Sequence, residues 1–246
     1  MPRQRPGTRI EDLMQAATRV FLEKGYRRAQ MADIARAMGV APGTVYLYVE
    51  SKEALFDAVM RVGTSPGILE SLQLPLKTPE PRATLAFIQD ALSNESRIGS
   101  LEAALKRRDV ADGSGELEEI ARELYAKAAK NWLALKLLER SALDWPELAA
   151  LWFGKYRLGI LQLLTRYFEK RMASGALRHA PDPPAAARLV LEMVAAFAMH
   201  CRQDDPSPAR IDSAVAASTV VDAIVNAYSA RGAKPIPRSR NGEWKR

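Results

Sequence analysis

The sequence predicts an all-α fold, and three observations support this class. Apolar residues recur at the three- and four-residue spacing of a helix face along most of the 246 residues. We find no stretch in which apolar and polar residues alternate, as they do in a half-buried strand. Glycine and proline stand between the helical segments, where they begin or end helices.

Four helices are predicted in the first part of the chain, over 8–24, 31–38, 42–48 and 52–62. Thr8 and Glu11 have the spacing of a capping box at the start of the first helix. Gly25 ends this helix, and Gly39 separates the second from the third because a residue without a Cβ tolerates the turn. Ser51 is the predicted N-cap of the fourth helix.

A change in composition after residue 63 indicates a domain junction. Five proline and glycine residues between 64 and 81 prevent a continuous helix there. Further helices are predicted over 82–95, 97–110, 116–141, 146–174, 183–203 and 208–230. We therefore divide the chain into residues 1–63, residues 64–230 and a tail of residues 231–246. The tail holds two prolines and six basic side chains and is expected to be disordered.

The positive charge of the chain lies at its two ends. The sequence has 36 Lys and Arg against 29 Asp and Glu, a net charge of +7. Residues 1–63 carry a net charge of +3, residues 64–230 carry −1 and residues 231–246 carry +5. A basic N-terminal segment fits binding to nucleic acid, and a solvated surface is the alternative. The tail is either a solvated segment or a source of nonspecific attraction to DNA.

The composition also disfavours several classes of site. The single cysteine, Cys201, excludes a disulfide framework and a multi-cysteine metal site and fits a reducing cytosol. His179 and His200 are the only imidazoles, so we expect no metal site and no cofactor. The longest apolar run has seven residues, whereas a membrane span needs about 20. No apolar segment follows the basic N-terminus as in a signal peptide, and we expect a cytoplasmic protein without a membrane partner.

The two short helices over 31–38 and 42–48 have the proportions of a helix-turn-helix. Ala35 is small enough for the second helix to cross closely, and Val40 and Val45 fill the space between the helices. The residues left on the outer side of the second short helix are Pro42, Gly43, Thr44, Leu47 and Tyr48. Small and hydroxyl-bearing side chains of this kind approach base edges and phosphates in a major groove. Lys52 adds a cation suited to a phosphate.

Three segments in this region resemble one known family. They are Phe21-x-x-x-Gly25-Tyr26, Asp33-Ile-Ala and Gly39-Val-Ala-Pro-Gly-Thr-Val-Tyr-x-Tyr-Val-x-Ser-Lys-Glu-Ala-Leu55. In this register residues 8–60 resemble the N-terminal domain of TetR-type transcriptional repressors, while the remainder matches only in length, helical content and helix spacing. The resemblance implies a homodimer in which each chain has a three-helix helix-turn-helix domain and a larger all-α domain for effector binding and dimerisation. It also implies that a small molecule releases the protein from a palindromic double-stranded operator.

The resemblance assigns roles to individual residues. Thr44 and Tyr48 match groove or phosphate contacts, and Gly43 permits close approach to DNA. Tyr46 and Lys52 match contacts to the DNA backbone. The two tyrosines are alternatively core aromatics, but at i and i+2 they cannot share one helix face, so at least one is expected to point outward. The full set of expected DNA contacts is Arg27, Arg28, Gln30, Pro42, Gly43, Thr44, Tyr46, Leu47, Tyr48 and Lys52.

Three positions depart from the pattern of the family. Gln30 stands where Thr or Ser is frequent, so it caps poorly, although it still donates to a phosphate. Ala41 replaces a frequent Ser at the cap of the recognition helix, and Val49 replaces an aromatic residue. The operator preference of the family therefore does not transfer. Arg27 and Arg28 are either phosphate contacts or a solvated helix end.

The C-terminal helices supply candidates for an effector pocket and for a dimer interface. The effector candidates are Asn131, Trp132, Trp152, Tyr156 and Phe197. Aromatic stripes at helical spacing are more often core than pocket, and the buried amide of Asn131 needs partners from the protein or from an effector. By analogy with the family, the last two helices pair across a two-fold axis. The expected interface residues are Leu189, Met193, Phe197, Val221, Ile224, Val225 and Tyr228.

Two other functions compete with an effector-responsive repressor. One is a regulator that acts through protein partners without a ligand, and an apolar cavity with a few polar groups favours effector sensing over it. The other is a helical enzyme, which the sequence disfavours because it has no Gly-rich phosphate loop and no His/Glu metal motif. We expect no catalytic residue. The effector, the operator and the sign of regulation do not follow from the sequence.

Overall fold

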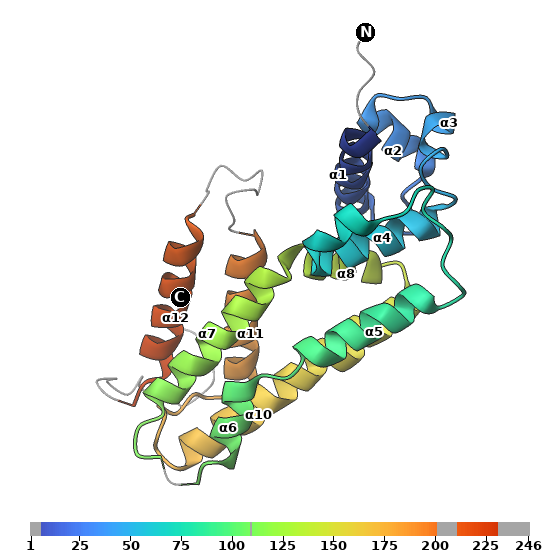
Figure 1. Ribbon diagram of the computed structural model, residues 1–246. Helices are drawn as coiled ribbons and strands as arrows, with labels where there is room; N and C mark the ends of the chain where they lie inside the picture. Colours follow the sequence, from blue (N-terminus) through green and yellow to red (C-terminus); the bar gives the residue numbers. More distant parts are fainter. Residues whose placement is uncertain (1–5, 109, 201–210, 231–246) are drawn as a thin grey trace, which may run out of the picture.

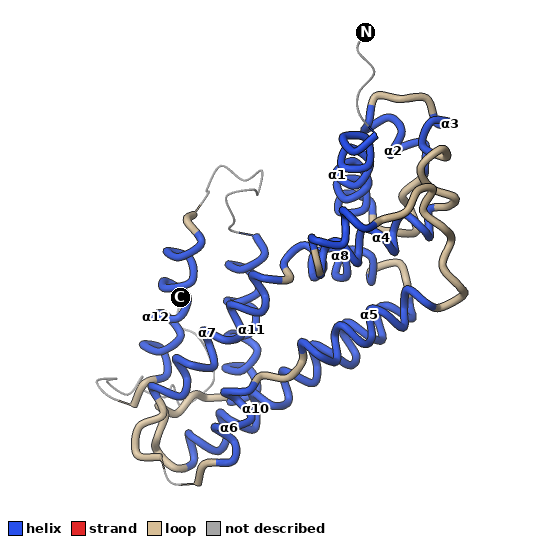
Figure 2. Tube along the Cα trace, viewed as in Figure 1, coloured by secondary structure: helices blue, strands red, loops and turns tan. Residues whose placement is uncertain are grey.

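The computed structural model describes residues 6–108, 110–200 and 211–230, and every regular element in these ranges is helical (Figures 1 and 2). The predicted all-α class is thereby confirmed. Cys201, the side chain of His200 and the tail of residues 231–246 lie outside the described residues.

Among the connections that the structure describes in full, the longest is the segment between residues 72 and 82. In order, the elements are α1 (Pro6–Lys24), α2 (Met31–Met38), α3 (Pro42–Val45), α4 (Lys52–Thr64), the 3₁₀ helix η1 (Pro66–Ser71), α5 (Ala83–Glu95), α6 (Gly99–Lys106), α7 (Ser114–Lys130), α8 (Trp132–Ala142), α9 (Pro146–Ala149), the π-helical η2 (Ala150–Arg157), α10 (Leu158–Ala173), α11 (Pro183–His200) and α12 (Ser213–Tyr228).

The helices α1 and α2 end where the sequence predicts, whereas the start of α1 differs. This helix begins two residues before Thr8, so the predicted N-cap at Thr8 is wrong; a proline occupies the first helical position, where its fixed φ suits the helix. Gly25 and Gly39 have φ values of 78° and 68° and end α1 and α2 as predicted. The hydroxyl of Ser51 accepts a hydrogen bond from the N–H of Ala54 at 3.1 Å, which confirms the cap of α4.

The helix α3 is shorter than predicted. It ends at Val45 rather than Tyr48. The N–H groups of Leu47 and Tyr48 donate to the carbonyls of Thr44 and Val45, three residues back, at 3.2 and 3.0 Å. These bonds have the tighter 3₁₀ spacing, which is common at the end of an α-helix.

Two long predicted helices are interrupted in the structure. The helix predicted over 116–141 divides at Asn131 into α7 and α8. The side-chain amide of Asn131 donates to the carbonyl of Lys127 at 3.1 Å, and such local side-chain bonds compete with regular helix. The helix predicted over 146–174 contains η2, whose wider π-helical turns separate α9 from α10.

The buried apolar side chains form two clusters, which we call the first core and the second core. The first core joins α1–α4 to α5, α8 and the start of η2, and the second core joins α6, α7, α10, α11 and α12. Leu137 and Leu138 of α8 are buried in the first core, and α8 packs on α1 and α4. Figure 1 shows α1–α4 at one end of the molecule and α7, α11 and α12 at the other. The first core therefore contains residues from both sides of the predicted boundary at residue 63.

Candidate DNA-binding interface and effector cavities

The turn between α2 and α3 is a helix C-terminal motif closed by backbone hydrogen bonds. The N–H of Gly39 donates to the carbonyl of Arg36 at 3.1 Å, and that of Val40 donates to the carbonyl of Ala35 at 3.0 Å. This pair of bonds is the Schellman arrangement, which requires a left-handed residue at Gly39. Ala35 and Val45 are fully buried. The turn and these two side chains fix the angle between the two helices.

The outer side of α3 is exposed. Pro42 and Gly43 are exposed, Thr44 is half-buried, and Leu47 is 71% exposed. A Cβ built on Gly43 would meet no atom within 4 Å, and this glycine does not adopt a left-handed φ. The fold therefore does not require a glycine at position 43. Close approach of a binding partner to the backbone is a reason for a glycine here.

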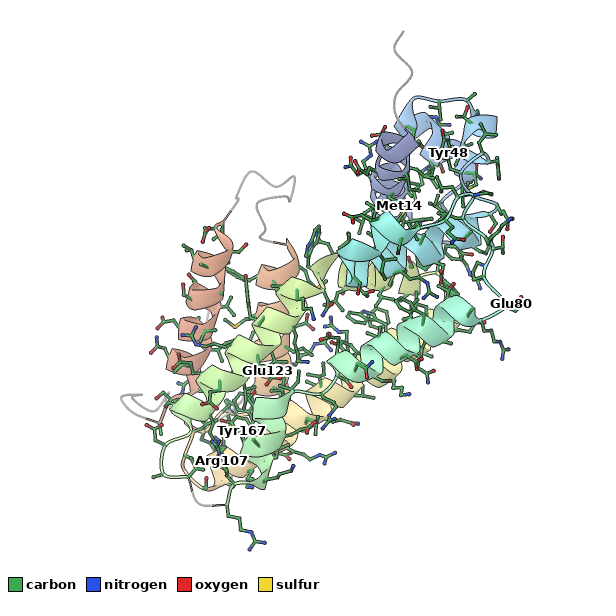
Figure 3. All side chains as sticks on the ribbon, viewed as in Figure 1. Met14, Tyr48, Glu80, Arg107, Glu123 and Tyr167 are labelled. Carbon is green, nitrogen blue, oxygen red and sulfur yellow. The ribbon has the colours of Figure 1, made fainter. Side chains whose placement is uncertain are left out.

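Tyr46 and Tyr48 lie in different environments, as their two-residue spacing predicts. Tyr46 is 51% exposed, whereas Tyr48 is half-buried and packs against the first core. The backbone carbonyl of Tyr48 also accepts a hydrogen bond from Leu76 at 2.8 Å. Figure 3 shows Tyr48 at the end of the molecule formed by α1–α4. Tyr46 is the more accessible of the two tyrosines.

Lys52 supports the loop between α1 and α2. Its ammonium donates to the carbonyls of Arg27 and Ala29, both at 3.1 Å, and lies 4.8 Å from the centroid of the Tyr26 ring. The Tyr26 hydroxyl donates to Glu53 at 3.0 Å, and burial together with this carboxylate raises the pKa of Tyr26. Two of the three ammonium donors of Lys52 thus hold the protein together, and one remains for an outside acceptor.

Gln30 and Asp33 meet at the start of α2. The side chain of Gln30 is exposed, and its backbone N–H donates to the carboxylate of Asp33 at 3.1 Å. Asp33 also pairs with Lys24 at 2.7 Å and with Arg36 at 3.2 Å. The hydrogen bond from Lys24, followed by that from Gln30, holds the pKa of Asp33 below its usual value. The acidic residue that completes this helix start was not among the predicted site residues.

Arg27 and Arg28 are both exposed. Among the described residues, Arg28 forms an ion pair with a residue beyond position 63, and Arg27 does not. The Nε of Arg28 lies 3.2 Å from Oδ2 of Asp144, in the turn after α8. This side chain remains 60% exposed. Arg28 therefore lies between the helix-turn-helix and the rest of the chain.

Two further contacts join this turn to the end of α1. The guanidinium of Arg140 donates twice to the carbonyl of Glu23, at 3.1 and 2.8 Å. The rings of Tyr26 and Trp145 stack with their centroids 4.8 Å apart and an angle of 29°. A Cβ on Gly25 would lie 3.3 Å from the carbonyl oxygen of Arg140, so the backbones approach closely here.

We call the set of residues in these contacts the α1–α8 joint: Glu23, Gly25, Tyr26, Arg28, Arg140, Asp144 and Trp145. Sequence analysis did not find the three residues from the end of α8. In the sequence they stand before a proline, which signals the end of a helix but does not identify what the turn contacts.

The five predicted effector residues do not form one site. Asn131 lines a small cavity of about 30 Å³ between α4, α5 and α8. Tyr156 lines a larger cavity of about 290 Å³ between α5 and the η2–α10 segment. Trp152 is buried and stacks on Tyr156, with ring centroids 5.2 Å apart, and its indole N–H has no hydrogen-bond partner among the described residues. Trp132 is half-buried beside Lys136.

Phe197 packs against the second core and lines none of these cavities. A third cavity, of about 220 Å³, lies between the η2–α10 segment and α11. Its charged residues are paired with one another, Arg157 with Glu139 and Glu192, and Arg188 with Glu192.

Three of the residues predicted for a dimer interface lie inside the protomer. Val221, Ile224 and Tyr228 are buried in the second core, and the ring of Tyr228 packs edge-on against Phe168 with centroids 4.9 Å apart. These three side chains are covered by their own chain.

Other apolar side chains near the C-terminus are accessible. Leu189 on α11 is 52% exposed, and Phe153 and Leu158, on the η2–α10 segment, are 40% and 43% exposed. The remaining predicted interface residues, Met193, Phe197 and Val225, are half-buried. Val215, near the start of α12, is 54% exposed, so the accessible apolar surface lies on the η2–α10 segment, on α11 and at the start of α12.

A buried ion pair fixes one end of the second core. Arg171 is fully buried and donates to both carboxylate oxygens of Glu116, at 2.7 and 3.1 Å. Its guanidinium also donates to the carbonyl of Ala104 at 2.6 Å. Tyr167 lies beside this pair, and burial raises its pKa. Figure 3 shows Tyr167 at the end of the molecule opposite Tyr48.

Neither a metal centre nor a membrane span is found within the ranges that the structure describes. No group of three or more His, Cys, Asp or Glu residues lies close enough to hold a metal ion. No described helix is long and apolar enough to cross a bilayer.

The fold and the helix-turn-helix define an all-helical regulatory protein with an N-terminal DNA-binding motif. Residues 13–59 match the family described as bacterial regulatory proteins of the tetR family, and residues 116–230 match the C-terminal domain of AefR-like transcriptional repressors. Together these matches cover more than half of the chain. The chain belongs to the tetR family.

Curated relatives match over the N-terminal helices. The uncharacterized HTH-type transcriptional regulator YvdT of Bacillus subtilis is 46% identical over 59 residues, which are 24% of this chain and 30% of the relative. The fatty acid metabolism regulator protein of the same organism is 36% identical over 61 residues, 25% of this chain and 30% of the relative. The matched segment thus spans about 30% of the length of these relatives.

Solved structures match over nearly the whole chain. The ketosteroid transcriptional regulator KstR2 of Mycobacterium tuberculosis aligns with a TM-score of 0.53 at 15% identity, covering 90% of this chain and 95% of that one. A regulatory protein of the tetR family from Rhodococcus RHA1 aligns with a TM-score of 0.50 at 18% identity, covering 91% and 97%. At such identities the similarity shows the fold.

Proposed function

We propose that the protein is a sequence-specific DNA-binding transcriptional repressor that a small-molecule effector releases from its operator. The observation that carries this proposal is the exposed outer side of α3 on a helix-turn-helix that the α1–α8 joint connects directly to the cavity-containing helices. Membership of the tetR family supports it. We also propose that the protein acts in the cytoplasm and is not an enzyme.

The proposed DNA contacts centre on α3. Tyr46 and Leu47 are the exposed large apolar side chains of this region, and Gly43 offers close approach. Pro42, Thr44 and Tyr48 flank them. Gln30 lies at the start of α2, and Arg27 lies in the loop before it. Arg28 and Lys52 have partners within the protein, so we assign them a smaller part in DNA binding.

We propose a homodimer that reads a palindromic operator. The accessible apolar side chains of the η2–α10 segment and α11, with Leu189 the most exposed, supply a surface for the two-fold contact. Recognition helices in such a dimer lie about 34–36 Å apart, or a longer distance that matches further turns of DNA. Val221, Ile224 and Tyr228 are buried in the second core and would contribute to the packing beneath this surface rather than contact the second protomer.

Effector binding is favoured over a ligand-independent regulator by the cavities. The cavity between α5 and the η2–α10 segment measures about 290 Å³, close to the lower end of the range for small-molecule sites, which starts near 300 Å³. Four aliphatic side chains line it together with polar and charged ones, so the cavity offers both the apolar surface and the polar groups expected of an effector pocket.

Selection of bound DNA from random sequence, followed by binding titrations, tests the proposal. We expect a palindromic consensus, and we expect Tyr46→Ala and Leu47→Ala to weaken binding to it by about 1–3 kcal/mol each. Leu143→Ala is the matched control, because Leu143 is also an exposed leucine, at 66%, but lies at the end of α8. The proposed surface is wrong if all three variants bind the selected DNA as the parent protein does.

A further inference from the structure

The cavity between α5 and the η2–α10 segment has an apolar wall and a polar rim. Figure 1 shows α5 and α10 running side by side, and this cavity lies between them. Leu92, Leu151, Ile160 and Leu163 provide the apolar wall. Polar side chains of Gln89, Ser93, Ser96 and Gln162 also line it, and none of its lining residues is acidic.

Two basic side chains line this cavity and have no acidic partner among the described residues. Lys155 and Arg166 are exposed, and neither forms an ion pair with a described residue. They are eleven positions apart, about three helical turns, which places them on one face of the η2–α10 segment roughly 16 Å apart. In the neighbouring cavity against α11, by contrast, Arg157 and Arg188 are neutralised by glutamates. Of these two cavities, the one between α5 and the η2–α10 segment has cations without an ion pair to a described residue.

The backbone around the cavity has two features that favour a binding site. Leu151 and Tyr156 line it together although they are five positions apart, and the π-helical turn of η2 brings such residues to one side. Short π-helical stretches are rare and occur frequently at functional sites. Gly159 also lines the cavity, and a Cβ built on it would meet no atom within 4 Å. The missing side chain leaves open volume.

Tyr156 supplies a hydrogen-bond donor at the inner end. Burial raises the pKa of its hydroxyl to about 12, so the hydroxyl is protonated at neutral pH. The stacked Trp152 holds the ring in place. A ligand with an apolar body and a polar head finds both kinds of partner here.

We propose that this cavity is the effector site and that its ligand is an anionic amphiphile, with the apolar body against Leu92 and Leu163 and a carboxylate or phosphate paired with Lys155 or Arg166. The inference rests on the proposed function, because it names the class of effector. Leu92 also lines the small cavity against α4 and α8, so a ligand that displaces α5 acts directly on the first core.

Titrations of the full-length protein with three probes test the ligand class. The probes are decanoate, decyl phosphate and 1-decanol, each kept below its micelle-forming concentration and followed by calorimetry. We expect at least one of the two anions to bind up to about fivefold more tightly than the alcohol, which is the gain that one exposed ion pair supplies. A preference for decanoate or for decyl phosphate distinguishes the two head groups. Equal binding of the alcohol, or no binding of either anion, overturns the proposal.

Variants locate the site. The double variant Lys155→Gln/Arg166→Gln is expected to lose up to about fivefold in affinity for the preferred anion and to leave the affinity for decanol unchanged. Lys106→Gln, on an exposed lysine of α6, should change neither affinity. Gly159→Leu fills the cavity and is expected to abolish binding. Gly154→Leu is its matched control, because Gly154 is a helical glycine with equally open space that does not line the cavity. Full binding by Gly159→Leu overturns the assignment.

Operator binding separates this inference from the proposed function. Each variant is also titrated with the selected DNA in the absence of probe. Loss of amphiphile binding with intact DNA binding supports the site. A parent protein that binds DNA but no anionic amphiphile refutes the ligand class alone, and one that binds the amphiphile but no DNA refutes the proposed function alone.

Discussion

The two cores of the molecule are stabilised in different ways. The first core is apolar and aromatic, with Phe21, Tyr26, Phe56 and Trp145 in mutual ring contact. The second core is closed by the buried ion pair of Arg171 and Glu116, which also ties the end of α6 to α7 and α10. A packed aromatic cluster has no single residue on which charge balance depends, whereas a buried pair leaves an unpaired charge when one partner is lost.

The comparison also shows how the proposed DNA-binding helices relate to the rest of the chain. The first core includes α8, which follows α7 of the second core directly after Asn131. Packed side chains and the α1–α8 joint thus connect α5 and α8 to α1.

Replacing Arg171 should have a large effect on stability. Arg171→Met leaves the buried Glu116 with only the more exposed Arg107, 3.4 Å away, as an ionic partner, and we expect a loss of about 3 kcal/mol in the free energy of unfolding, measured with urea. Arg122→Met is the control, because Arg122 forms an exposed i,i+4 pair with Glu118 worth only about 0.3–0.5 kcal/mol. The double variant Arg171→Met/Glu116→Gln should recover part of the loss. Equal stability of the two single variants would contradict the role of the pair.

Shortening Leu137 tests whether α8 belongs to the first core. This side chain is fully buried, and Leu137→Ala should cost about 3 kcal/mol, within the range for a buried leucine. Hydrogen exchange should show the loss of protection in α1 and α4 as well as in α8. Leu133→Ala, at a half-buried site on the same helix, should cost less. Unchanged exchange in α1 would show that the first core does not depend on α8.

Alkaline pH should lower the free energy of unfolding through Tyr156, whose side chain packs against both cores. Its pKa is raised by burial to about 12, above the value near 10 in the unfolded chain. The folded state then holds the proton more tightly, so the stabilisation is complete below pH 10 and falls by about 2 kcal/mol between pH 10 and pH 12. Tyr156→Phe should make the free energy of unfolding less dependent on pH in this window. An unchanged slope in this variant would assign the effect to other tyrosines.

Changing Asp144 should have the smallest effect on stability and a readable effect on DNA binding. Because Arg28 is 60% exposed, Asp144→Asn should cost less than about 1 kcal/mol. If Arg28 contacts DNA, its release should strengthen operator binding by up to about fivefold. Glu50→Gln is a control that removes an exposed ion pair with Lys77 outside the α1–α8 joint. Weaker operator binding by Asp144→Asn would show that the pair holds Arg28 in place for DNA.

Sequence reasoning predicted local features well and missed contacts between distant segments. The glycines that end α1 and α2 and the cap at Ser51 follow from backbone preferences of single residues, and the structure confirms them. The interruption at Asn131 was not predicted, because an apolar pattern continues across it and the competing hydrogen bond involves only one side chain. The pairing of Arg28 with Asp144 joins residues 116 positions apart, and no spacing rule reaches that far.

The sequence by itself determined the helical class, the positions of most helices and the helix-turn-helix with its family, because these depend on periodicity and on motifs within about 50 consecutive residues. The tertiary structure alone decided that α8 completes the first core, that Val221, Ile224 and Tyr228 of α12 are buried within the protomer, and that two cations without an ion pair to a described residue share a cavity with an apolar wall. Whether a side chain is buried, and whether a charge is paired, depends on which helices pack against each other. That packing is determined by residues far apart in the sequence.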